Sequence, residues 1–143
     1  GGARRYYQQA LELRENLGDQ RGVASVLNNL GRVADILEEF PASREHFIRA
    51  LETGWGNNAI PVVLDSLLGL AELWLHCGSQ AEAVKLLALV VSHAASNQES
   101  VARAEYLIAS ISKEIAGEDF DVLFASGEKL ELDQIVAEIL STS

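Results

Sequence analysis

The apolar residues of this chain recur at the spacing of buried helix faces. One such stripe runs along residues 20–38 and consists of Val23, Val26, Leu27, Leu30, Ala34 and Leu37. Similar stripes, separated by breaks rich in Gly, Pro, Ser and Asn, predict helices over 3–17, 20–38, 41–54, 58–77, 80–95, 98–116, 118–126 and 132–141. The pattern therefore predicts an all-α chain.

The helices repeat in pairs with a period of about 40 residues. Residues 27–34 align with 67–74 under this shift. The second-helix positions that align are Ala3, Tyr7 and Ala10, then Ser43, Phe47 and Ala50, then Ala83, Leu87 and Val90. We therefore expect repeats over residues 1–116, with units at 3–17 (partial), 20–54, 58–95 and 98–116 (partial), followed by capping helices over 117–143.

The repeated positions resemble the tetratricopeptide pattern, in a long variety of about 40 residues. Its small and large positions are occupied here by Leu27, Leu30, Gly31, Ala34, Ser43, Phe47 and Ala50. The next unit departs from the pattern, with Ala71 at the glycine position, Trp74 at the tyrosine position and Leu87 at the aromatic position. The resemblance implies antiparallel helix pairs stacked into a right-handed α-solenoid, with Gly31 serving helix packing.

The resemblance also implies a ligand groove on the concave face, lined by the first helix of each repeat. Its residues would be Ser25, Asn28, Arg32 and Asp35 in one repeat and Asp65, Leu68, Glu72 and Leu75 in the next, with Asn29 at the border. Amide side chains suit the main chain of an extended peptide, and Arg32 suits a carboxylate. Two readings of Leu68 and Leu75 are a hydrophobic ligand helix and a tail that packs back into the groove. An ordinary solvated helix face is the alternative to a binding groove.

The tail carries a second resemblance. Residues 116–120, 124–127 and 130–140 are similar to the C-terminal end of large ATP-binding bacterial transcriptional regulators of the LuxR-like and related signal-transducing class. Gly117, Phe120, Gly127, Leu130 and Leu132 carry this likeness, while Ser126 stands where those proteins usually have an acidic residue. The chain begins Gly1-Gly2-Ala3 and has no Met, so we expect it to be part of a longer protein.

The composition limits which classes of molecule this chain is expected to bind. The net charge is −10, with 21 acidic and 11 scattered basic residues, which disfavours direct contact with nucleic acid. No apolar stretch is long enough to cross a bilayer, so no membrane partner is expected. The single Cys77 has no partner for an internal disulfide, which favours a cytoplasmic location.

Candidate chemistry is sparse. No phosphate loop, His-Glu-x-x-His motif or paired Cys is present, and His46, His76 and His93 are far apart in sequence, so we expect no metal, no cofactor and no enzymatic activity. His76 and Cys77 diverge by about 100° on a helix and do not converge on one ion. Cys77 is interpreted as a small buried hydrophobe. Trp55 is interpreted as filling a gap over the next helix, with a ligand-facing role as the alternative.

The leading hypothesis is a protein- or ligand-binding helical-repeat module that forms the C-terminal sensor or interaction part of a larger bacterial transcriptional regulator or signalling ATPase. Its partners would be a protein or peptide, including neighbouring domains of the same chain. The alternative is a stand-alone cytosolic scaffold or adaptor. Self-association through the first helix is also expected, because Tyr6, Tyr7, Ala10 and Leu13 form an apolar face with no preceding helix to cover it.

Overall fold

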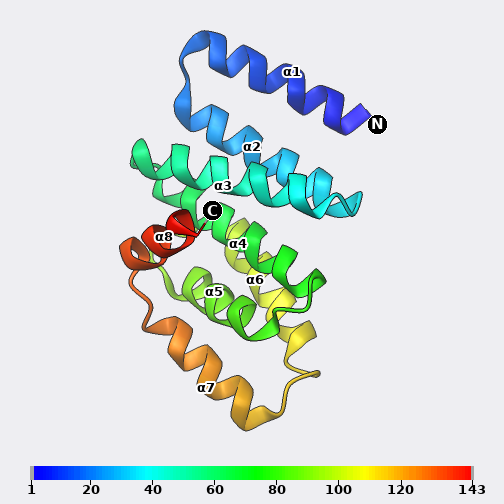
Figure 1. Cartoon of the computed structure of the whole chain (residues 1–143). Helices are drawn as coiled ribbons and strands as arrows, with labels where there is room; N and C mark the ends of the chain where they lie inside the picture. The colour runs from blue at the N-terminus through cyan, green and yellow to red at the C-terminus, as the bar shows by residue number, and fades with distance from the viewer. Residues whose placement is uncertain (1, 143) are drawn as a thin grey trace.

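The computed structural model describes residues 2–142, and this part of the chain is helical without a strand (Figure 1). The helices are α1 (Gly2–Leu17), α2 (Gln20–Ile36), α3 (Phe40–Gly56), α4 (Ile60–His76), α5 (Gln80–Ser92), α6 (Gln98–Ile111), α7 (Gly117–Glu128) and α8 (Leu132–Ser141). The structure is a tetratricopeptide-like solenoid, and the all-α prediction is confirmed.

The first four turns share one design, which recurs at even intervals along the chain. A residue with positive φ follows each helix, at Gly18, Glu38, Asn58 and Gly78. The next residue donates its backbone N–H to a carbonyl near the end of that helix, as Asp19 does to Arg14 (3.0 Å) and Ser79 does to Trp74 (2.8 Å). This hydrogen bond satisfies a carbonyl that the helix end leaves free. Helices of nearly equal length and turns of one design thus produce the regular period of the sequence.

The helices stack in order as antiparallel neighbours (Figure 1). Each of α2, α3, α4 and α5 packs against the helix that follows it in the chain. In addition α2 packs against α4, and α4 packs against α6. The first helices of successive repeats are therefore adjacent, as the repeat pattern predicts.

The core is centred on Phe47 of α3. Its ring is 1% exposed and lies between α2 and α4, where Gly31 and Gly69 have no side chain to oppose it. A Cβ atom on Gly31 would come within 2.8 Å of the ring, so the packing role expected of Gly31 is confirmed. Leu27, Leu30, Leu70 and Leu87 are buried as well, whereas Trp74 is only partly buried.

Trp55 does not fill the gap between α3 and α4, so the prediction made for this residue is wrong. Gly54 is buried at the crossing, where its missing Cβ would lie 3.2 Å from Val63 Cγ2. The two helices approach through Gly54, and Trp55 on the neighbouring face is 37% exposed. Cys77 also departs from its interpretation as a buried residue: it follows the last residue of α4 and is exposed.

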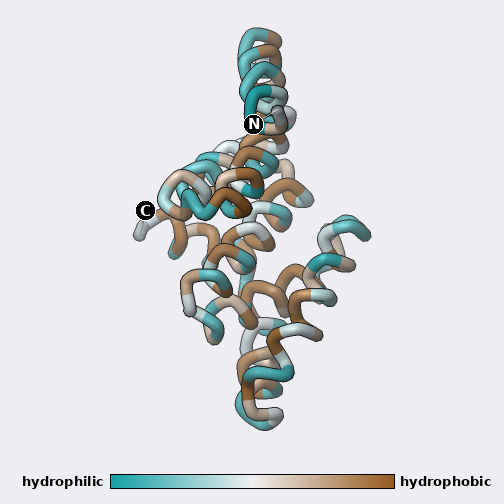
Figure 2. The backbone as a smooth tube through the Cα atoms, turned by 90° about the vertical axis from the view of Figure 1, so that its right-hand side faces the viewer, coloured by the Kyte–Doolittle hydropathy of each residue, from teal (hydrophilic) through white to brown (hydrophobic). Residues whose placement is uncertain are grey.

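The stacking order changes after α6. In a regular array α7 would pair with α6, but it packs against α5 instead (Figure 1). Gly127 permits the close approach, since a Cβ atom there would lie 2.7 Å from Ala88 Cβ. The chain then returns as α8, which contacts α3 and buries Val136 and Ile139 in the main core. At the other end of the stack α1 packs against α2 and contains no buried residue (Figure 2).

Candidate binding groove

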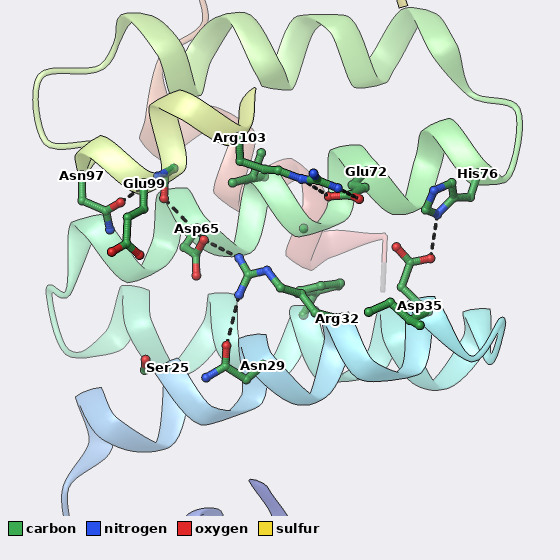
Figure 3. Close-up of a pocket in the computed structure, with 15 residues that line it drawn as sticks. Ser25, Asn29, Arg32, Asp35, Asp65, Glu72, His76, Asn97, Glu99 and Arg103 are labelled. Carbon is green, nitrogen blue, oxygen red and sulfur yellow. Dashed lines mark hydrogen bonds and ion pairs between the residues drawn. The ribbon is translucent and has the colours of Figure 1, made fainter. Parts of the chain in front are cut away.

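A groove of about 610 Å³ lies along the first helices of three successive repeats (Figure 3). Side chains of α2, α4 and α6 point into it, and Phe47 of α3 also lines it. Residues far apart in sequence meet here because equivalent helices are neighbours in the stack. None of the described residues of α7 or α8 lines the groove.

Seven residues predicted from the repeat pattern line this groove. They are Ser25, Asn29, Arg32 and Asp35 of α2 and Asp65, Leu68 and Glu72 of α4. The helix faces were therefore assigned in the correct rotation for these positions. Their use in ligand binding stays a prediction.

Asn28 and Leu75 lie outside the groove. Asn28 is fully buried (0% exposed), where its amide donates to the carbonyl of Val62 (3.2 Å) and accepts from the hydroxyl of Ser66 (2.7 Å). The prediction that Asn28 faces a ligand is thus wrong, because its amide instead joins α2 to α4. Leu75 is partly buried against the main core and is not among the lining residues.

The alternative in which the tail fills the groove is also excluded for the described residues. Ile135 and Ile139 of α8 lie instead beside a smaller cavity of about 270 Å³, together with Ile48 of α3 and Leu70 of α4. The tail therefore covers a different part of the solenoid. Leu68 is 3% exposed, so it contributes to the core beneath the groove.

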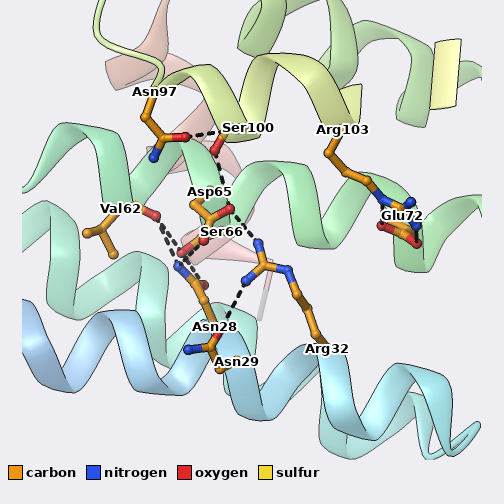
Figure 4. A network of polar contacts seen from close by, with 10 residues as sticks. All are labelled: Asn28, Asn29, Arg32, Val62, Asp65, Ser66, Glu72, Asn97, Ser100 and Arg103. Atoms are coloured by element: carbon orange, nitrogen blue, oxygen red, sulfur yellow. Dashed lines mark hydrogen bonds and ion pairs between the residues drawn. The ribbon is translucent and has the colours of Figure 1, made fainter. Parts of the chain in front are cut away.

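Asp65 is the centre of a polar network that joins three helices (Figure 4). Arg32 forms an ion pair with Asp65 and also donates to the side-chain oxygen of Asn29 (3.4 Å). The hydroxyl of Ser100, at the start of α6, reaches the same carboxylate at 3.4 Å. One carboxylate of α4 thus accepts hydrogen bonds from both neighbouring first helices.

Two further side-chain pairs cross the groove. Glu72 of α4 accepts two hydrogen bonds from Arg103 of α6, of which the one from Nε is 3.2 Å long. These hydrogen bonds raise the pKa of Arg103 from its ordinary value, in spite of opposing desolvation. Asp35, at the end of α2, lies 2.8 Å from Nδ1 of His76, the last residue of α4. Both cationic guanidinium groups of the groove are therefore already paired with carboxylates.

The sequence pattern did not predict the part of the groove that comes from α6 and from the ends of the other helices. The missed polar residues are His76, Asn97, Glu99, Ser100 and Arg103. The repeat shift carries Asp65 to position 105, but α5 has only 13 residues where α3 has 17, so the register shortens. Ser100 of α6 meets Asp65 at a separation of 35 residues, which lies within the 33–38 residues that separate the bonded pairs of α2 and α4. Asn97 is recognisable in sequence as the N-cap of α6, where it accepts from the N–H of Ser100 (2.8 Å).

The groove is acidic overall. Four carboxylates line it (Asp35, Asp65, Glu72 and Glu99) against two arginines (Arg32 and Arg103). The carboxylates at Glu38-Glu39, 118–121 and 128–133 lie outside the groove on exposed surface. Within the described residues no helix is both long and apolar enough to cross a membrane.

Comparison with known proteins agrees with the fold. Residues 2–53 match the family model described as "Tetratricopeptide repeat". No curated protein and no solved structure matches the chain. Repeats of this family are typically non-catalytic and mediate contacts between proteins, so the solenoid and the match together indicate a protein-interaction module.

Proposed function

We propose that the groove binds an extended segment of a partner protein. The observation that carries this proposal is the convergence of three first helices on one polar groove of about 610 Å³. A helix face that is merely solvated would not need side chains from α2, α4 and α6 to share a common concave surface. The amide of Asn29 and the hydroxyl of Ser25 supply donors and acceptors for the main chain of such a segment.

The partner segment is expected to carry a basic side chain. Arg32 and Arg103 are paired with Asp65 and Glu72, so a carboxylate ligand would have to displace an existing ion pair. Glu99 is exposed at the start of α6 and adds to the acidic excess of the groove. A Lys or Arg of the partner gains from this excess without breaking a contact. We therefore no longer expect Arg32 to bind a carboxylate of the ligand.

The partner segment is also expected to carry an apolar anchor residue. Ile36 lies at the end of α2 on the rim of the groove and is 80% exposed. An aliphatic partner side chain that covers Ile36 removes apolar surface from water on both molecules, at about 25 cal/mol per Å². The ligand is therefore a peptide segment of mixed basic and apolar character.

The wider context that we propose is the C-terminal part of a larger bacterial transcriptional regulator or signalling ATPase. The likeness of residues 116–140 to the ends of such proteins supports this, and so does the role of Gly127 in closing the array against α5. The partner segment would then include neighbouring domains of the same chain, and the location would be cytoplasmic. The encoding reading frame tests this context: an upstream phosphate loop or a helix-turn-helix domain supports it, and a short frame without either supports an adaptor.

Peptide titration tests the groove itself. Fluorescence anisotropy would compare labelled short peptides of equal length and apolar content that carry either two Lys or two Glu. We expect the basic peptide to bind more tightly, with affinity that falls as salt increases. Glu99→Lys should weaken that binding several-fold, whereas Glu128→Lys, an equal charge reversal at the end of α7, should not. Equal affinities for both peptides, or equal effects of both variants, would refute the proposal.

A further inference from the structure

Three potential metal ligands meet at one end of the groove. Asp35 comes from the last turn of α2, while Glu72 and His76 lie one turn apart on α4 (Figure 3). One ligand atom from each of these side chains lies within 4.8 Å of the other two. We propose that Asp35, Glu72 and His76 form a binding site for a divalent transition-metal ion such as Zn²⁺.

The donor set selects the class of ion. Zn²⁺ binds imidazole nitrogen and carboxylate oxygen at about 2.0–2.2 Å and often takes three protein ligands, with water in the remaining position. Mg²⁺ and Ca²⁺ prefer an all-oxygen shell, so the imidazole of His76 disfavours them. All three side chains line the groove, which leaves the remaining coordination positions facing open space. Water, or a side chain of a bound partner, can complete the coordination there.

Burial and backbone charge favour a cation at this place. The side chain of Asp35 is 8% exposed, and His76 is the partner that the structure gives this carboxylate. Asp35 and His76 both lie in the last turn of their helices, where the free carbonyl groups give a partial negative charge. Phe40 packs beside the imidazole at 6.4 Å between ring centroids, which limits the directions in which His76 can turn.

Only small movements are needed to close the site. Ligands of a tetrahedral ion at these bond lengths are about 3.4 Å apart, compared with an upper bound of 4.8 Å here. The His76 side chain is 48% exposed and has room for a small adjustment beside Phe40, while the buried Asp35 provides a fixed anchor. Glu72 has a competing partner, because Arg103 holds its carboxylate. One carboxylate oxygen can turn to the metal when Arg103 is released or shared.

The competition with Arg103 makes the proposal sharply testable. Isothermal titration of tag-free protein with ZnCl₂ should give saturable binding of one ion per chain. His76→Gln and Asp35→Asn should each weaken the affinity by about tenfold or more, because each removes a direct ligand. Arg103→Gln should strengthen it, since Glu72 is then free. Co²⁺ added in place of Zn²⁺ should give visible absorption bands that His76→Gln abolishes.

Matched variants separate this site from adventitious binding. His93→Gln removes an imidazole at the far end of α5 and should leave the affinity unchanged. Arg32→Gln removes the same charge as Arg103→Gln from the same groove, but frees Asp65 rather than Glu72, and should give a smaller gain. Circular dichroism would establish that each variant is folded. If Asp35→Asn does not fold, His76→Gln alone tests the loss of a ligand. The proposal is overturned if no saturable binding occurs, if His76→Gln binds Zn²⁺ as wild type does, or if Arg32→Gln matches or exceeds Arg103→Gln.

Discussion

Phe47 lies so close to Gly69 that any side chain on Gly69 would overlap its aromatic ring. The same ring also covers Gly31, so one residue of α3 fills the space that two glycines leave on α2 and α4. Phe47 and Gly69 are also both among the residues that line the groove. Core packing and groove shape are thus determined by the same residues.

The first prediction concerns this contact. Phe47→Ala should lower the free energy of unfolding by about 3–5 kcal/mol, because a fully buried ring is replaced by a cavity. Gly69→Ala should lower it by about 1–3 kcal/mol through overpacking. Gly56→Ala is the control, since nothing lies within 4 Å of a Cβ atom there. Urea denaturation measures all three, and a loss below about 1 kcal/mol for Phe47→Ala would contradict the packing.

The two adjacent asparagines of α2 give a second prediction. Asn28 is buried and its amide bonds Val62, Ser66 and Asp65, so Asn28→Ala should cost about 1–3 kcal/mol through the loss of these buried hydrogen bonds. Asn29 is only partly buried at the groove, and Asn29→Ala should stay within about 0.5 kcal/mol. Thermal unfolding of both variants checks this contrast. Equal losses would show that the two positions are not separated into core and groove.

Gly127 carries the third prediction. Gly127→Ala should loosen α7 from α5, because the added methyl group would meet the backbone of Lys85. Faster hydrogen exchange over residues 117–141 would reveal the loss, while α2 and α3 keep their protection. Gly117→Ala is the matched control, with open space around the new Cβ atom. If exchange in the tail is equal in the two variants, the close approach at Gly127 is not what holds the tail.

The repeat made most of the fold predictable from sequence. The boundaries of the first four helices agree closely with the prediction, because a turn of constant geometry recurs at even intervals. The pattern could not show that Asn28 turns inward, since a buried amide and a ligand-facing amide occupy neighbouring angles on the same helix. Only the partners Val62 and Ser66, 34 and 38 residues away, decide between them.

The far end of the groove was unpredictable for a different reason. The short α5 changes the register before α6, so the repeat shift fails where Ser100 and Arg103 enter. The cluster of Asp35, Glu72 and His76 was missed because its members lie on two helices and follow no short motif. Sequence spacing shows convergence within one helix, but it does not show which turns of two helices face each other.

The fourth prediction follows from His46 of α3. Desolvation by burial lowers the pKa of His46 below its ordinary value near 6.5, and Arg49 and Arg4 act in the same direction, against Glu45. Its Nδ1 atom is buried without a hydrogen-bond partner. Below about pH 6.5 the unfolded chain therefore takes up a proton at this residue more readily than the folded chain. Stability should fall as the pH decreases through this range.

Comparison with His46→Gln isolates this contribution. The difference in free energy of unfolding between wild type and variant should shift against wild type as the pH falls from above to below the ordinary pKa of histidine. High salt should leave most of the effect in place, because desolvation is the largest cause and is not screened. A difference that does not change with pH would show that His46 is equally free to protonate in both states.

The last prediction concerns α1, which has a neighbour on only one side. Tyr7, Ala10 and Leu11 pack against α2, but Tyr6, Leu13 and Leu17 are 67%, 57% and 67% exposed. A terminal helix of a repeat array has a neighbouring helix on only one side, and the apolar surface on its other side favours association. We therefore expect the chain to self-associate through α1, with a mass by light scattering that rises with concentration. Leu13→Glu with Leu17→Glu should restore the monomer, because two carboxylates would have to be buried in the contact. Val122→Glu is the control, since Val122 of α7 is 70% exposed and lies at the other end of the solenoid. The prediction is wrong if the chain is a strict monomer at high concentration, or if Val122→Glu dissociates the oligomer as fully as the α1 variant does.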